Sequence, residues 1–148
     1  MKKLVYLLSL VLVMAGLSSC DKDSDPTPPP AIVGRWELNR GLLSGFAAPN
    51  QGLNGNAIDL YMLEGYGSRI DIFEDKTFNV NVRQTVVVDF QGTWEFANDK
   101  LTLTYDDGTD PEEYTYTKTG NIEELSSTVQ NYALDSTTRG RIQVFYRK

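Results

Sequence analysis

The chain has 148 residues, with 14 Lys and Arg against 20 Asp and Glu, one cysteine and no histidine. This length favours a single folded domain, and the net charge of -6 argues against nucleic acid as a partner. The lack of histidine excludes Ser-His-Asp and Cys-His catalytic groups and imidazole zinc sites, and the single cysteine excludes a disulfide within the chain.

The first 20 residues have the pattern of a bacterial lipoprotein signal peptide. A short basic start precedes the uncharged, mostly apolar segment 4–17, which is too short to span a membrane. The segment closes with Leu17-Ser18-Ser19-Cys20, which resembles the lipobox, in which small residues precede a cysteine that becomes acylated. We therefore expect residues 1–19 to be a lipoprotein signal peptide and Cys20 to carry acyl chains such as palmitate. The alternative is an ordinary secretory peptide with an incidental cysteine.

Residues 20–30 predict an extended tether between this anchor and the folded domain. They contain Asp21, Asp23 and Asp25, followed by four of the six prolines of the chain, a composition that stays solvated and extended. An acidic patch directly after the cysteine resembles the surface-export signal of Bacteroidetes lipoproteins, although a plain charged spacer has the same composition. We expect a lipid-anchored protein of the outer membrane, on its periplasmic or its cell-surface face.

From residue 31 onward the sequence predicts short strands joined by turns. Ile32, Trp36 and Leu38, for example, alternate with polar residues, as on a strand with one buried face. Eight such strands within 31–148 predict an all-β domain, an up-and-down antiparallel eight-stranded barrel, with an antiparallel β-sandwich as the alternative. The alternation is weakest over 118–134. The expected strands cover residues 32–40, 68–73, 77–83, 85–96, 101–105, 114–116, 122–134 and 141–148.

The connection 41–67 is too long and too apolar for a simple loop. Asn56 is expected to cap a short helix that Gly65 ends. The apolar side chains of this segment predict either a plug that completes the core or a lid over a binding cavity. The candidate ligand or lid residues are Leu42, Leu43, Phe46, Tyr61 and Met62, together with Trp94 on the strand 85–96.

Three short motifs give the chain a family resemblance. Ile32-Val33-Gly34-Arg35-Trp36 comes first, and the segments 73–78 and 92–96 follow it at the expected spacing behind the lipobox. Together they resemble the lipocalins, and more closely the small lipocalin-like lipoproteins of the Bacteroidetes. The resemblance implies a calycin-type barrel over 31–148, with Gly34 and Trp36 on the floor of its closed end. It also implies that Trp36 lies beneath an arginine from the C-terminal region, with three candidates, Arg139, Arg141 and Arg147.

Two hypotheses for function follow from these patterns. The acidic residues of 106–113 are typical of a solvated surface turn, and no base is placed to activate a serine or threonine, so we expect no enzyme, catalytic residue, metal or cofactor. The first hypothesis is a cell-envelope protein, held at the membrane through Cys20, whose lipocalin-like barrel binds a small apolar or amphipathic ligand. The alternative is a filled-barrel interaction or structural surface lipoprotein that binds glycan or protein through its loops.

Overall fold

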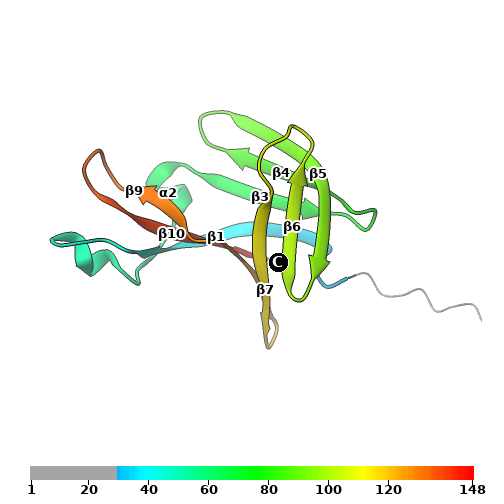
Figure 1. Ribbon diagram of the computed structural model, residues 1–148, viewed down its shortest axis with the longest axis horizontal. Coiled ribbons are helices and arrows are strands. Elements are labelled where there is room, and N and C mark those ends of the chain that lie inside the picture. Colours follow the sequence, from blue (N-terminus) through cyan, green and yellow to red (C-terminus); the bar gives the residue numbers. More distant parts are fainter. Residues whose placement is uncertain (1–29) are drawn as a thin grey trace, which may run out of the picture.

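The computed structural model describes residues 30–148. The signal peptide, Cys20 and the tether up to residue 29 lie outside the described residues. Within the described part, strands dominate and the two helices are short (Figure 1). Neither helix is long and apolar enough to cross a membrane. The elements are β1 (Gly34–Ser44), η1 (Asn50–Leu53), β2 (Ala57–Ile58), α2 (Leu60–Glu64), β3 (Gly67–Ile72), β4 (Thr77–Arg83), β5 (Val87–Ala97), β6 (Lys100–Tyr105), β7 (Glu112–Thr119), β8 (Ile122–Ser127), β9 (Gln130–Ala133) and β10 (Arg139–Arg147).

Eight of these strands close into an antiparallel barrel. Neighbouring strands run in the order β1-β3-β4-β5-β6-β7-β8-β10, and β10 pairs again with β1, so the ring has no open edge. Side chains alternate across the barrel wall, and Phe78 and Val80 on β4, like Leu101 and Leu103 on β6, are buried as predicted. The predicted all-β, up-and-down eight-stranded barrel is confirmed, and the sandwich alternative is wrong.

The remaining two strands lie outside the ring. The stretch 122–134, where the alternation is weak, forms two strands, β8 and β9, rather than one. The strand β2 pairs with the outer half of β1, and β9 pairs with the outer half of β10. These four segments (40–44, 57–58, 130–133 and 139–145) form a sheet that runs away from the barrel, which we call the ribbon (Figure 1).

A β-bulge separates the barrel part of β1 from its ribbon part. The register with β10 slips by one residue between Leu38 and Arg40. The extra residue shifts the alternation, so that Trp36 is buried before the bulge and Leu43 is buried after it. The strand therefore continues to Ser44 instead of ending near residue 40, where the first predicted strand stops.

The main core fills the closed end and the middle of the barrel. At its centre is Trp36, which is fully buried and meets the ring of Tyr116 edge-on, with 6.1 Å between the ring centroids. The indole Nε1 of Trp36 donates to the backbone carbonyl of Ile32 at 2.8 Å, so the one polar atom of the ring is satisfied. On β5, Gly92 lets two strands approach closely, because a Cβ there would lie 2.0 Å from the carbonyl oxygen of Thr104.

A second, smaller core lies on the ribbon and contains most of the buried side chains of the segment 41–67. Its buried members are Leu43, Phe46, Leu60 and Ile142. The ring of Phe46 packs directly against the backbone of Gly140. Any larger residue at this position would clash, because its Cβ would lie 2.3 Å from the ring. The buried side chains of this segment therefore pack on the ribbon, beside the main core.

The helix α2 positions Leu60 in this second core. Its N-cap is Asp59, whose side chain accepts from the backbone N–H groups of Tyr61 and Met62, so the predicted cap at Asn56 is wrong by three residues. The predicted end at Gly65 is confirmed, since Gly65 has the left-handed conformation with φ of 65°.

Candidate functional site

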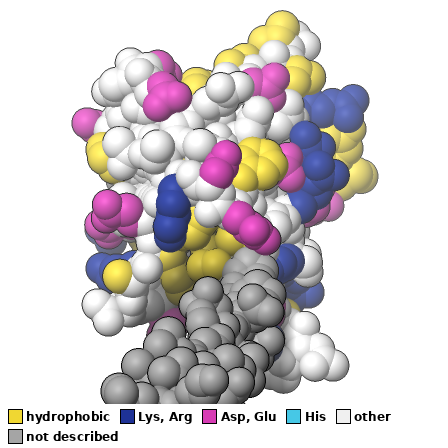
Figure 2. Space-filling view, turned by 90° about the vertical axis from the view of Figure 1, so that its right-hand side faces the viewer, with side chains coloured by type: hydrophobic (Ala, Val, Ile, Leu, Met, Phe, Trp, Pro, Cys, Tyr) yellow, Lys and Arg dark blue, Asp and Glu magenta, His cyan; other side chains and the backbone are white. Residues whose placement is uncertain are grey.

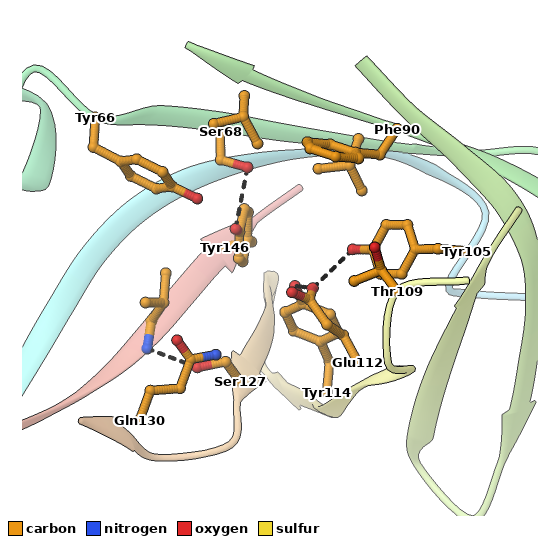
Figure 3. Close-up of a pocket in the computed structure, with 13 residues that line it drawn as sticks. Tyr66, Ser68, Phe90, Tyr105, Thr109, Glu112, Tyr114, Ser127, Gln130 and Tyr146 are labelled. Atoms are coloured by element: carbon orange, nitrogen blue, oxygen red, sulfur yellow. Dashed lines mark hydrogen bonds between the residues drawn. The ribbon is translucent and has the colours of Figure 1, made fainter. Parts of the chain in front are cut away.

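The barrel holds a cavity at the end opposite Trp36. Its volume is about 160 Å³, and side chains from β3, β4, β5, β6, β7, β8, β9 and β10 line it, together with Tyr66 before β3 and Thr109 in the β6–β7 loop (Figure 3). An engineered apolar cavity of about 150 Å³ holds benzene, so this space accommodates a small organic molecule. The apolar part of the wall is formed by Val80, Val82, Phe90 and Val144.

Four tyrosines and one glutamate give the cavity its chemistry. The hydroxyl groups of Tyr105 and Tyr114 both donate to Oε2 of Glu112, at 2.9 and 2.6 Å. Across the cavity, the hydroxyl of Tyr146 donates to Oγ of Ser68 at 3.2 Å. Figure 3 shows the carboxylate of Glu112 directed at the tyrosines rather than away from the cavity. The cavity is therefore an aromatic chamber with one carboxylate on its wall.

The strand geometry explains why these side chains meet. Glu112 and Tyr114 are two residues apart on β7, so both side chains point to the barrel interior. Tyr105 is the last residue of β6, the strand paired with β7, which brings its hydroxyl to the same carboxylate. Ser68 and Tyr146 come from β3 and β10, on the other side of the barrel. The site thus needs the closed ring, because no single hairpin supplies all five side chains.

The phenol groups act as hydrogen-bond donors at neutral pH. Burial raises the pKa of Tyr105, Tyr114 and Tyr146 well above the ordinary tyrosine value of about 10, and the negative charge of Glu112 raises each of them further. Burial also raises the pKa of Tyr66. All four hydroxyls therefore stay protonated, and none of them contributes a negative charge to the cavity.

The carboxylate of Glu112 has no cationic partner among residues 30–148. The side chains that line the cavity include no lysine or arginine, and no described Lys or Arg nitrogen lies within 4.0 Å of Glu112. Some glutamates of the barrel are paired, such as Glu123 with Lys118 at 2.6 Å, whereas Glu37 and Glu95 are exposed and have no described Lys or Arg partner. On the face shown in Figure 2, acidic and basic side chains are interspersed rather than gathered in one patch. Glu112 therefore differs from the exposed, unpaired glutamates by its place on the cavity wall, among the tyrosine hydroxyls.

The predicted floor residues, Gly34 and Trp36, lie close to Lys148 where the chain enters the barrel. Gly34 has a φ of 132°, and a Cβ there would lie 2.8 Å from Cε of Lys148. The Nζ of Lys148 lies 5.6 Å from the centroid of the Trp36 ring and donates to the backbone carbonyls of Ala31 and Val33, at 2.7 and 2.6 Å. The cation above Trp36 is thus a lysine.

None of the three candidate arginines takes that place. Arg147 pairs with Glu124 at 2.9 Å, and Arg139 and Arg141 lie in the ribbon half of β10. The prediction of an arginine at the floor was therefore wrong in residue type. The last residue of the chain, Lys148, makes the contact instead, because β10 ends next to the start of β1.

The predicted ligand or lid residues do not line the cavity. Leu43 and Phe46 belong to the second core, and Leu42 is half-buried on the ribbon. Tyr61 and Met62 are 52 % and 77 % exposed on α2. Trp94 is buried in the main core, where its Nε1 donates to the backbone carbonyl of Phe73 and Lys76 covers its ring at 3.7 Å. Of the segment 41–67, all of which is described, Tyr66 alone lines the cavity.

The sequence interpretation missed Glu112, which it assigned to a solvated acidic turn. One signal was present, because period-2 alternation from Tyr114 back to Glu112 places both side chains on one face. The neighbouring Asp106, Asp107 and Asp110 hid this signal, since they are exposed loop residues of the same charge. Among residues 30–148, no cluster of three or more acidic or cysteine side chains is arranged to hold a metal ion.

Comparison with known proteins adds no family assignment. No protein-family model matches the chain, and no curated protein matches it. The closed eight-stranded antiparallel barrel is compatible with a lipocalin-like fold. Further conclusions about function therefore depend on the cavity and on the motifs of the sequence.

Proposed function

We propose that this protein is a lipid-anchored protein of the outer membrane whose barrel binds one small amphipathic molecule in the cavity next to Glu112. The observation that supports this proposal best is the cavity itself, which leaves about 160 Å³ inside an otherwise packed barrel. Eight-stranded barrels either fill their interior with side chains or hold one small ligand. The lining combines aromatic rings with a few converging polar groups, which is typical of small-molecule sites.

The point at which the chain enters the barrel determines where the proposed anchor lies relative to the cavity. Ala31 and Val33 lie at the closed end, where Lys148 binds their carbonyl groups. A tether over residues 20–30, attached to an acylated Cys20, would therefore hold the closed end toward the membrane. The cavity at the opposite end would face the aqueous compartment, where a soluble ligand reaches it.

Native mass spectrometry of the full-length protein, released from maltoside micelles, tests the proposal. We expect a species heavier than the protein by the mass of one small molecule. Val82→Phe places a ring in the cavity and should abolish this species, whereas Val86→Phe, on the exposed β4–β5 turn, should retain it. Circular dichroism controls for folding, because overpacking costs about 1–3 kcal/mol.

A protein without any bound species, in which Val82→Phe changes nothing, would contradict the proposal. That result would favour the alternative, an interaction or structural lipoprotein that binds glycan or protein through its loops.

A further inference from the structure

We infer that the ligand is a small organic cation, an aliphatic ammonium compound whose charged group sits between the tyrosine rings and the carboxylate of Glu112. This inference rests on the proposed function, because it assigns a chemical class to the molecule in the same cavity. It rests on three observations: the charge of the cavity, the aromatic faces of its wall and the position of its opening.

The first observation is the uncompensated charge. Both phenol hydrogen bonds end on Oε2 of Glu112, and no described residue donates to its Oε1. Because the cavity has no lysine or arginine on its wall, a bound cation would supply the missing partner. The side chain of Glu112 is partly buried, and an ammonium group that enters the cavity gains a charge-assisted hydrogen bond to Oε1, which is stronger than the bond that a neutral donor makes.

The second observation is the aromatic wall. Phe90 meets Tyr105 edge-to-face with 6.1 Å between centroids, and Tyr114 meets Tyr146 in the same way at 5.7 Å. The faces of such rings carry negative charge density and attract ammonium groups, most strongly at sites shielded from water. Figure 3 shows the rings of Tyr66, Phe90, Tyr105 and Tyr146 surrounding the space in front of Glu112.

The same features disfavour the other charged class of small ligand. A fatty acid or a phosphate would bring a second negative charge next to Glu112, with no described cation on the wall to offset it. A neutral polyol would donate hydrogen bonds to Glu112 but would leave its negative charge without a counter-ion. The charge of Glu112 is thus what distinguishes the cation from the alternatives.

An ammonium group is available from free amines and from lipid headgroups. The cavity lies at the end of the barrel opposite the point where the chain enters, so we expect free amines to be the source. A lipid headgroup would also bring its phosphate close to Glu112. Glycerophosphocholine is a lipid headgroup without acyl chains, so comparing its binding with that of choline distinguishes a headgroup from a free amine.

The test uses the full-length protein in maltoside, a detergent with a neutral headgroup, and isothermal titration calorimetry. The probes are choline and 3,3-dimethylbutan-1-ol, which has the same shape but a carbon atom in place of the charged nitrogen. We expect choline to bind at least tenfold more tightly than the alcohol. Glycerophosphocholine should bind more weakly than choline, and tighter binding would identify a headgroup as the source of the same cation.

A pair of neighbouring glutamates supplies matched variants. Glu112→Gln keeps the shape and a hydrogen-bond acceptor but removes the charge, and it should weaken choline binding at least tenfold while leaving the alcohol unchanged. Glu113→Gln is the control, because the side chain of Glu113 is 54 % exposed beside Lys100, outside the cavity. The comparison of the two probes on the unmodified protein remains decisive even where a variant fails to fold.

Equal affinities for choline and the alcohol would overturn the inference, as would Glu112→Gln binding choline as tightly as the parent. Either result would leave the proposed function standing if both probes bind and Val82→Phe abolishes their binding. Failure of both probes to bind would also overturn the inference, and the bound species in native mass spectrometry would then decide the proposed function separately.

Discussion

Trp36 has the largest fully buried side chain among residues 30–148. Its ring is fully buried at the closed end, its Nε1 is hydrogen-bonded, and Lys148 covers one side. Truncating such a side chain removes a large apolar area and leaves a cavity that the rigid barrel fills only in part.

Trp36→Ala is therefore expected to lower the free energy of unfolding by roughly 3–5 kcal/mol. Urea denaturation followed by circular dichroism measures the change. Phe73→Ala is the control, because the ring of Phe73 is 47 % exposed and its loss should change stability far less. Equal stabilities for Trp36→Ala and the parent protein would rule out the floor role of Trp36.

Glu124 lies on β8 and binds side chains from β1 and β10, the two strands whose pairing closes the ring. It accepts hydrogen bonds from Arg40 and from Arg147, the latter at 2.9 Å. Hydrogen bonding from Arg40 lowers the pKa of Glu124, and the bond from Arg147 lowers it further. Because the pKa is lower in the folded state, the charged Glu124 stabilises the fold when the pH is above the ordinary glutamate pKa of about 4.3. This stabilisation is lost as the pH falls through the folded-state pKa.

Glu124→Gln should thus lower stability by about 1 kcal/mol at pH 7, a modest effect because the arginines are partly exposed. The difference from the parent should shrink as the pH falls below about 4.3, where the unfolded state takes up a proton, and it should vanish only below the lowered folded-state pKa. Thermal melts between pH 3 and about 7 measure it, with Glu95→Gln on the exposed face of β5 as control. A difference that stays constant over this range would show that charge is not its cause.

At the scale of the elements, alternation predicts the barrel strands well, because each has one face in the interior. It fails at β1, where the bulge after Leu38 shifts the buried positions by one residue and makes 41–44 look like loop. It also fails at Glu112, where an inward carboxylate follows a run of outward ones. The failure at β1 depends on pairing across the barrel, which a single sequence does not contain, whereas at Glu112 the alternation with Tyr114 was present but was hidden by the exposed acidic residues before it.

The second core should contribute to stability without contributing to binding. Phe46 packs on Gly140 in the ribbon, and neither residue lines the cavity. Phe46→Ala should lower the melting temperature, with a cost of roughly 3–5 kcal/mol typical of a buried phenylalanine. Measured well below that temperature, the affinity for a cavity probe such as choline should remain that of the parent.

Loss of probe binding in Phe46→Ala would contradict this prediction. If Phe46→Ala abolishes probe binding in a protein that circular dichroism shows to be folded, the segment 41–67 controls access to the cavity. Met62→Ala is the matched control, because Met62 lies in the same segment but is 77 % exposed.

At the scale of the whole molecule, attachment through Cys20 is the proposal that decides where the cavity operates. Cys20→Ser should block acylation, because only a thiol forms the thioether to the lipid. Labelling with a palmitate analogue and fractionation of cells should then show an unlabelled, unprocessed precursor. Processing and fractionation unchanged from the parent would contradict the lipobox, whereas Ser24→Ala in the tether should have no effect.

The pairing of β1 with β10 sets the order in which the fold can form. These are the first and last strands of the described chain, and both cores depend on them, since Leu38 and Val144 pack against each. Such contacts span almost the whole domain, and bringing distant segments together slows folding. A ribosome-bound chain that lacks β10 would expose the unpaired edges of β1 and β8, and such edges are sites for aggregation. Synthesis must therefore reach β10 before the ring can close.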